Sequence, residues 1–206
     1  VLVDGVSSIG GVPFQFDDWG IDFAVTSSQK CLMSSPGMSF VAISDRAWKS
    51  CESSQLNKSY FNFPAIRKSL SKLQSQTPGT TPVHLIMQVN AALSLIHEEG
   101  IAKVFARHDE MGKVARDWVK EQGLSLQCPD LEEYSPTLTA IRLFDDCDPQ
   151  RVREHLKQRG IFVARGIGHF ESNSIRIGHM GDIRPDDLQH TLDCLTEIIK
   201  SQGAHA

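Results

Sequence analysis

The sequence has few cysteines, and they lack the spacing of a disulfide framework or a zinc site. The five are Cys31, Cys51, Cys128, Cys147 and Cys194. The number is odd and no Cys-x-x-Cys pair occurs, which is typical of a reducing compartment, so we expect the cytoplasm. No His-Glu-x-x-His motif and no His/Cys cluster with ligand spacing occurs either, so the sequence predicts no metal site.

Long apolar runs and an excess of one charge are also missing. No run approaches the roughly 20 apolar residues that a membrane-spanning helix needs, and no signal peptide is visible. Lys and Arg number 21 against 25 Asp and Glu, a net charge of −4. Neither half is basic, so the electrostatic footprint of a nucleic-acid-binding protein is absent. We therefore expect neither a membrane nor a nucleic acid among the partners.

What remains is ordinary globular composition, with 40% hydrophobic and 22% charged residues in a chain of 206. Apolar and β-branched runs predict strands over 1–3, 21–27, 39–44, 137–144, 161–164 and 174–178. Helical spacing predicts helices over 83–100, 101–121, 148–159 and 185–201. Residues 49–79 are polar and predict loops with at most short helices. The pattern indicates an α/β fold in two parts, residues 1–110 and a small α+β domain over 111–206.

A carboxylate and a lysine follow two successive predicted strands. Asp4 stands where the first strand ends, and Lys30 follows the next. Strands joined by a crossover tend to run parallel, so both side chains are expected at the sheet edge where open α/β sheets bind ligands. There the pair indicates pyridoxal phosphate (PLP) chemistry, in which a lysine amine forms a Schiff base and a carboxylate keeps the pyridine nitrogen protonated. The alternative is a solvated lysine and an N-capping aspartate.

The whole segment 3–40 resembles the class V, fold-type I PLP-dependent aminotransferases. It reads VDGVSSIGGVPFQFDDWGIDFAVTSSQKCLMSSPGMSF, with the family's aspartate, small residues, Ser/Gln-rich turn, lysine and Pro-Gly in order. The resemblance implies that Lys30 is the Schiff-base lysine and Asp4 the partner of the pyridine nitrogen. It also implies that Val6 packs on one face of the ring and that Gln29 hydrogen-bonds the phosphate.

A threonine-rich segment precedes the helix predicted over 83–100. Hydroxyls and backbone N–H groups at a helix start suit a phosphate. The resemblance implies that Thr80 reaches the cofactor phosphate of a neighbouring subunit, and hence a homodimer with shared active sites. The alternative is a plain N-cap. Thr77 departs from relatives that place a tyrosine at this position.

Arg176 lies between two isoleucines in the strand predicted over 174–178. An inward-facing arginine needs an anionic partner to offset its desolvation, and its planar fork pairs with a carboxylate through two hydrogen bonds. In the family, an Arg-Ile-Gly segment supplies the arginine that binds the substrate carboxylate. The alternative is an exposed arginine on the solvent face. We interpret the nearby His169 and His179 as structural.

The resemblance implies transfer of an amino group from a small amino acid, of alanine or serine type, to a small 2-oxo acid such as glyoxylate or pyruvate. Thr-Thr-Pro-Val before the helix is closer to alanine/serine–glyoxylate aminotransferases. The alternatives are a 2-aminoethylphosphonate–pyruvate aminotransferase, another PLP lyase or a cysteine desulfurase, and a non-catalytic fragment. Residues 165–175 contain no cysteine, which disfavours the desulfurase, and we expect Cys31 to pack inward.

The resemblance begins at the Asp4 strand and does not include the segment that precedes this strand in the family. We therefore expect the later part of the PLP-binding large domain followed by the complete small domain. The preceding segment carries phosphate donors and an aromatic residue that stacks on the pyridine ring. For this reason we expect residues 1–206 alone to bind PLP poorly.

Overall fold

The computed structural model describes residues 1–74, 76–128 and 134–202. They form two compact units, one of Val1–Ile9 with Phe14–Leu95 and one of Gly10–Pro13 with the chain from Ile96 onward. The division precedes the boundary expected at 110/111, because the first turns of the long helix starting at residue 101 pack within the second unit. Across the described ranges, no helix is both long and apolar enough to cross a membrane.

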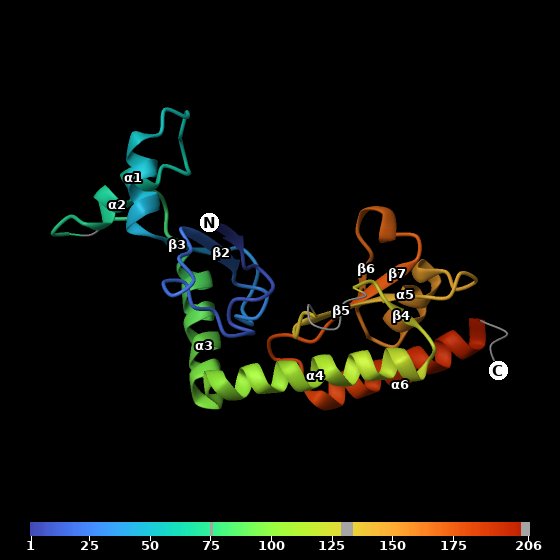
Figure 1. The fold of residues 1–206 in the computed structure, drawn as a ribbon. Coiled ribbons are helices and arrows are strands. Elements are labelled where there is room, and N and C mark those ends of the chain that lie inside the picture. Colours follow the sequence, from blue (N-terminus) through green and yellow to red (C-terminus); the bar gives the residue numbers. More distant parts are fainter. Residues whose placement is uncertain (75, 129–133, 203–206) are drawn as a thin grey trace. The chain divides into compact units, whose positions relative to one another are not determined.

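A three-stranded sheet organises the first unit (Figure 1). Its strands are β1 (Leu2–Asp4), β2 (Phe23–Ser27) and β3 (Ser39–Ile43), in the order β1-β2-β3. β1 and β2 are parallel, as the sequence predicts, and β3 is antiparallel to β2. Asp4 pairs in register with Val25, so both strands end at the same edge of the sheet.

Three helices follow the sheet. The polar stretch contains two short ones, α1 (Asp45–Ser53) and α2 (Phe63–Leu70). Their N-caps are Ser44 and Asn62, whose side chains accept hydrogen bonds from backbone N–H groups three residues on. α3 (Val83–Glu99) matches the expected helix, although only part of its apolar stripe is buried, at Val89, Ala92 and Ile96.

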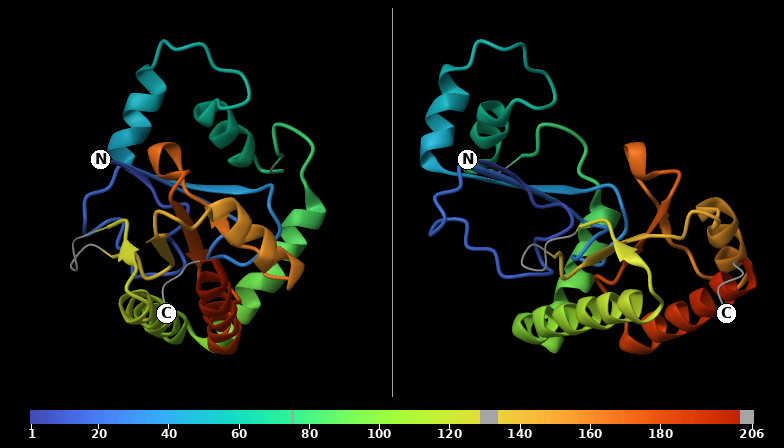
Figure 2. Two further views of the ribbon diagram at one scale, coloured as in Figure 1. Left: turned by 90° about the vertical axis from the view of Figure 1, so that its right-hand side faces the viewer. Right: turned by 45° about the vertical axis from the view of Figure 1, so that its right-hand side comes forward.

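The second unit is a four-stranded antiparallel sheet covered by helices. The strands β4 (Ser125–Leu126), β5 (Leu138–Arg142), β6 (Ala164–Arg165) and β7 (Ser174–Gly178) lie in the order β4-β5-β7-β6. The helices are α4 (Ile101–Glu121), α5 (Pro149–Gln158), the short η1 (Gly168–Phe170) and α6 (Pro185–Gln202). α4 and α6 run side by side in both Figures 1 and 2.

Two details of this sheet differ from the sequence prediction. β4 has only two residues and its pattern is too short to recognise. The strand expected over 161–164 begins only at Ala164, because the chain first closes the end of α5. Gly160 adopts a φ of 79° and the Ile161 N–H returns to the carbonyl of Leu156 at 3.0 Å, which is a helix-ending turn.

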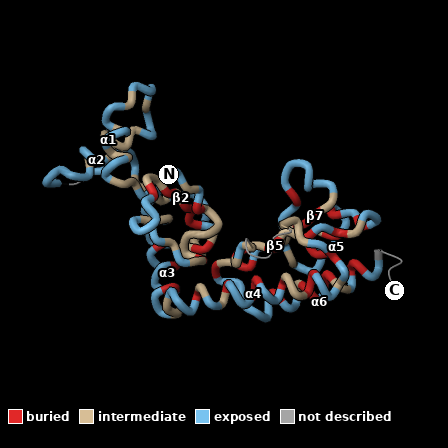
Figure 3. The backbone as a smooth tube through the Cα atoms, viewed as in Figure 1, coloured by how far each residue is buried: buried red, intermediate tan, exposed pale blue. Residues whose placement is uncertain are grey.

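The core of the second unit lies between the sheet and its helices (Figure 3). Successive side chains of a strand alternate between faces, and the buried apolar side chains Ile141 of β5 and Ile175 and Ile177 of β7 lie on the face that the helices cover. α4 buries one stripe at three- and four-residue spacing, as predicted. The largest fully buried apolar side chains are Met111, Ile141, Leu156, Ile175, Leu192 and Leu195.

Two histidines are fully buried in the second unit. His108 Nδ1 lies 3.1 Å from the carbonyl of Gly11, and its Nε2 accepts from the N–H of Gly181 at 3.1 Å, so the proton is assigned to Nδ1. His179 Nε2 lies 2.9 Å from Thr139 Oγ1. Burial lowers the pKa of both rings, and it lowers the pKa of His179 to about 4, with a further contribution from a nearby arginine.

We expect the free energy of unfolding of the second unit to fall as the pH is lowered from about 6.5 toward 4. His179 then binds a proton only in the unfolded chain, which favours unfolding. The loss is on the order of 3 kcal/mol at pH 4, and His108 contributes in the same direction. Urea unfolding followed by Trp118 fluorescence, in a background with Trp19→Phe and Trp48→Phe, measures this.

The variant His179→Gln should reduce the pH dependence, whereas His84→Gln, at an exposed position of α3, should leave it unchanged. The comparison uses the slope of the free energy of unfolding against pH, because loss of the hydrogen bond to Thr139 also changes the stability at neutral pH. An undiminished slope in His179→Gln would show that His179 does not cause the pH dependence.

Candidate functional site

The turn after β1 places the Asp4 carboxylate. The N–H of Gly5 donates to the carbonyl of Val25 at 2.9 Å, which continues the pairing with β2. Asp4 Oδ1 then accepts from the N–H of Val6 at 3.0 Å, which leaves Oδ2 open for a further hydrogen bond. A Cβ on Gly5 would lie 2.4 Å from Ile9 Cδ1 and 3.3 Å from the Val25 carbonyl oxygen. The glycine therefore permits the tight turn behind the carboxylate.

The turn after β2 is held by Ser28, which is fully buried. Its hydroxyl donates to the carbonyl of Ser35 at 2.6 Å and accepts from the N–H of Met38 at 3.3 Å. Its backbone also pairs with Met38. Lys30 projects from this closed turn and is half-buried. Met33 has a φ of 50°, a left-handed conformation that is unusual for a residue with a side chain.

A thiol joins the two turns. Cys31 is fully buried and its Sγ donates to the carbonyl of Ser7 at 3.4 Å. Ser7 lies three residues after Asp4, and Cys31 directly follows Lys30. Burial raises the pKa of this thiol to about 11, so it stays protonated and keeps its role as a donor. The structure thus brings the turns of Asp4 and Lys30 together, and Cys31 packs inward as predicted.

Two further hydroxyls near the lysine have no partner. Ser27 Oγ and Ser34 Oγ are buried and make no hydrogen bond within the described parts of the chain. Unpartnered buried polar atoms are uncommon, and these two precede and follow Lys30. A polar ligand at the turn would offer them partners. Together with a half-buried amine and an exposed carboxylate, this donor set fits PLP.

The residues expected to hold the phosphate are exposed. Gln29 and Thr80 both lie on the surface of the first unit. The loop before α3 is bonded by Thr77 instead, whose Oγ1 donates to the carbonyl of Gly79 at 2.7 Å and lies 2.9 Å from Thr81 Oγ1. Within the described ranges no hydrogen bond links Thr80 to the Lys30 turn. Thr77 therefore stabilises this loop, a role that the sequence did not indicate.

Arg176 lies in the second unit, on the face of β7 opposite the helices. Its cross-strand neighbours are Ala140 of β5 and Ala164 of β6. The side chain is half-buried, and Nε donates to the carbonyl of Arg165 at 2.8 Å. The two alanines leave room for the Arg176 side chain, and the hydrogen bond to the carbonyl of Arg165 orients its guanidinium. Both terminal nitrogens lack a partner in the part of the chain that the structure describes, so they can form a fork for a carboxylate.

A family model for class-V aminotransferases matches residues 1–180. The chain is 35% identical over 184 residues to an L-aspartate–glyoxylate aminotransferase of Paracoccus denitrificans, a match that covers 89% of this chain and 46% of the relative. It is 34% identical over 205 residues to a serine–glyoxylate aminotransferase of Arabidopsis thaliana, with 98% and 51% covered. The chain therefore spans about half the length of the curated relatives it matches.

The fold has similar solved structures. The crystal structure of an alanine–glyoxylate aminotransferase from Nostoc sp. superposes with a TM-score of 0.88 at 30% identity. That match covers 96% of this chain and 53% of the other. The residues that the family model matches include the Lys30 turn and the strand of Arg176.

We expect iodoacetamide at pH 8 to modify Cys31 roughly 100-fold more slowly than Cys51. A pKa of about 11 leaves Cys31 almost entirely as the unreactive thiol, whereas Cys51 on α1 is half-buried. Peptide mapping by mass spectrometry over a time course gives the two rates. In strong urea the rates should converge, and equal rates in the folded protein would show that Cys31 is accessible.

Proposed function

The chain belongs to the class-V aminotransferase family, and on that premise we propose that it uses PLP to move an amino group from a small amino acid to a small 2-oxo acid. Members of this family are PLP-dependent transaminases of fold type I, and this chain has that fold. The chain spans about half of its relatives, so the proposal concerns the whole protein that carries these residues.

The observation that supports the proposal most directly is the joining of two turns. The Cys31 thiol bonds the carbonyl of Ser7 at 3.4 Å, so the residue after Lys30 contacts the turn that begins at Asp4. An amine and a carboxylate held at one sheet edge suit the aldehyde and the ring nitrogen of one small cofactor. One carboxylate oxygen of Asp4 stabilises its own turn, which leaves the other oxygen and the Lys30 amine for a ligand.

In this proposal each side chain has a separate task. PLP supplies an electron sink that stabilises negative charge at the Cα of the amino acid. Asp4 accepts a hydrogen bond from the ring nitrogen through Oδ2, because Oδ1 already accepts from the backbone of Val6. Val6 packs on one face of the ring. The Lys30 amine holds the cofactor and carries the proton at Cα.

Gln29 and Thr80 are proposed as phosphate donors. Both are exposed in this chain, which is compatible with a ligand or a second subunit at these positions. Thr80 would serve the site of a partner subunit, so we propose a homodimer with shared sites. The family is generally dimeric.

Arg176 is proposed to bind the carboxylate of the substrate. Its two terminal nitrogens have no partner among the described residues, while Nε is occupied by the carbonyl of Arg165. The names of the relatives from Paracoccus, Arabidopsis and Nostoc share glyoxylate and differ in the amino donor. We therefore propose glyoxylate as the acceptor and an alanine- or serine-type amino acid as the donor.

Borohydride reduction of the protein incubated with PLP should attach the cofactor to Lys30. Peptide mapping identifies the modified lysine, and Lys30→Ala should abolish the label together with the visible absorbance of the bound cofactor. Lys49→Ala is the matched control, since Lys49 is exposed on α1 of the same unit. A label on another lysine in the unaltered protein would refute the assignment.

The variant Arg176→Lys should raise KM for the amino acid about 10- to 100-fold, because a lysine cannot form the two-pronged pair. Loss of one hydrogen bond to a charged group costs about 1.5–3 kcal/mol. PLP absorbance should be unchanged. The control Arg142→Lys, at an exposed position of β5, should leave KM as it is. Unaltered kinetics with alanine and serine in Arg176→Lys would place Arg176 outside the substrate site.

A further inference from the structure

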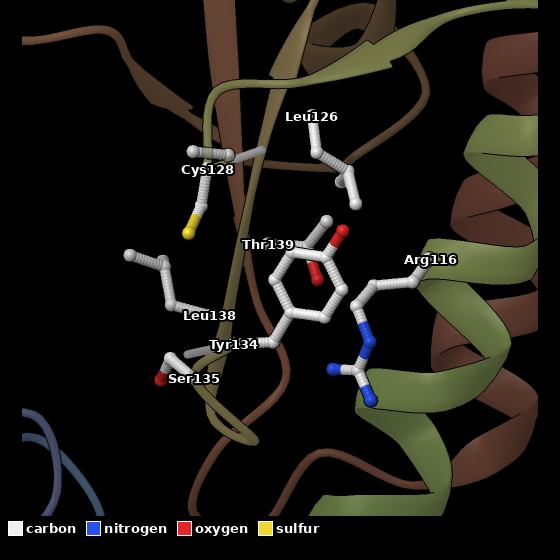
Figure 4. A pocket seen from close by; sticks show the side chains of 8 residues that line it. Arg116, Leu126, Cys128, Tyr134, Ser135, Leu138 and Thr139 are labelled. Carbon is white, nitrogen blue, oxygen red and sulfur yellow. The ribbon is translucent and has the colours of Figure 1, made fainter. Parts of the chain in front are cut away.

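A pocket of about 200 Å³ lies in the second unit, beside the sheet and α4 (Figure 4). Its apolar walls are Leu126, Leu138 and Ala140. Arg116 reaches toward it from α4, and the ring of Tyr134 lies over the guanidinium, 5.1 Å from the guanidinium carbon to the ring centroid. A cavity with apolar walls and one cation is the kind of site that takes a small amphiphilic molecule.

A glycine inside α4, Gly112, leaves room for the Arg116 guanidinium. A Cβ on Gly112 would lie 2.8 Å from Arg116 Nη1 and 3.2 Å from His179 Cε1. A glycine within a helix costs about 1 kcal/mol relative to alanine. A side chain at this position would displace the tip of Arg116 and crowd the His179 ring. The glycine therefore leaves the space that the Arg116 guanidinium and the His179 ring occupy.

Arg116 has no anionic partner among residues 1–74, 76–128 and 134–202. Its Nη1 is buried and makes no hydrogen bond to any described residue. The neighbouring Asp117 is paired with Lys113 at 2.6 Å and lies 4.0 Å from Lys120. His179 beside it is kept neutral, because burial and the arginine both lower its pKa. Within the part of the chain that the structure describes, no acidic group balances the positive charge at the pocket.

These features select one class of ligand. A guanidinium pairs best with a planar carboxylate, and a single cation among apolar walls matches one negative charge better than a dianion. A cavity of about 150 Å³ lined by apolar residues accommodates benzene. We propose that the pocket binds a small monocarboxylate with an apolar body, of the size of benzoate, through Arg116. All its residues lie in the second unit, so the inference is independent of the cofactor site in the first.

A thiol in the pocket provides the test. Cys128 lines the pocket, whereas Cys51 lies on α1 in the other unit, and both are half-buried. The protein is treated with iodoacetamide at increasing concentrations of benzoate, and peptide mapping gives the rate at each cysteine. We expect a dissociation constant on the order of 1 mM. At ten times that concentration, alkylation of Cys128 should slow about tenfold, while alkylation of Cys51 should not change.

Two comparisons test the role of charge without altering the protein. Benzyl alcohol has the same ring and no charge, and it should protect Cys128 at least about tenfold more weakly than benzoate. Inorganic phosphate should give no protection. Equal protection by benzyl alcohol, or equal slowing at both cysteines, would overturn the proposal.

A variant pair tests the arginine itself. Arg116→Met should abolish the protection by benzoate, whereas Arg142→Met, at an exposed arginine of β5 in the same unit, should retain it. Circular dichroism of both variants establishes that the fold is kept. Undiminished protection in a folded Arg116→Met would overturn the proposal.

Discussion

The candidate site depends on the parallel pairing of β1 with β2, because this pairing ends two strands at one sheet edge. Asp4 pairs with Val25, and the N–H of Gly5 extends the pairing by one more hydrogen bond. The chain between β1 and β2 contains no regular helix. This connection therefore does not fix the distance between the Asp4 turn and the Lys30 turn. The bond from Cys31 to the carbonyl of Ser7 adds that constraint.

The Lys30 turn is stabilised mostly by main-chain groups and by one serine. Ser28 both donates and accepts through its hydroxyl, which satisfies two backbone groups in a turn that cannot pair with a strand. The backbone carbonyl of Lys30 accepts from the N–H of Met33 within the turn. Its amine makes no hydrogen bond to any other residue that the structure describes, which leaves it available for the proposed reaction with a ligand.

In the second unit, arginines differ in how their charge is compensated. Arg107 is bonded to Glu99 and to the carbonyls of Gly181 and Ile183, so its charge and donors are used within the fold. Arg176 donates through Nε to a backbone carbonyl, and no other hydrogen bond of its guanidinium reaches a described residue. Arg116 stacks under Tyr134, and its buried Nη1 has no hydrogen-bond partner among the residues that the structure describes. Desolvating a cation without an acceptor is unfavourable, so the last two are the places where a carboxylate would be most favourable.

The amino-acid sequence by itself predicted the order of strands and helices and the pair Asp4 and Lys30. Periodicity and turn residues are local signals, and α4 and β7 have the expected bounds because their apolar spacing is regular. The two-residue β4 and the late start of β6 were not predictable, since they depend on partners and on the turn at Gly160.

Only the tertiary structure decided which polar atoms have partners. The sequence presents Cys31, Ser28 and Gly112 as ordinary small residues, and their importance comes from what lies against them. Cys31 contacts a carbonyl 24 positions away, and Gly112 makes room for Arg116 and His179. Such contacts arise from residues distant in the chain, and no local pattern encodes them. The residue types that can do the chemistry are therefore readable from the sequence, whereas their accessibility and pairing follow from packing.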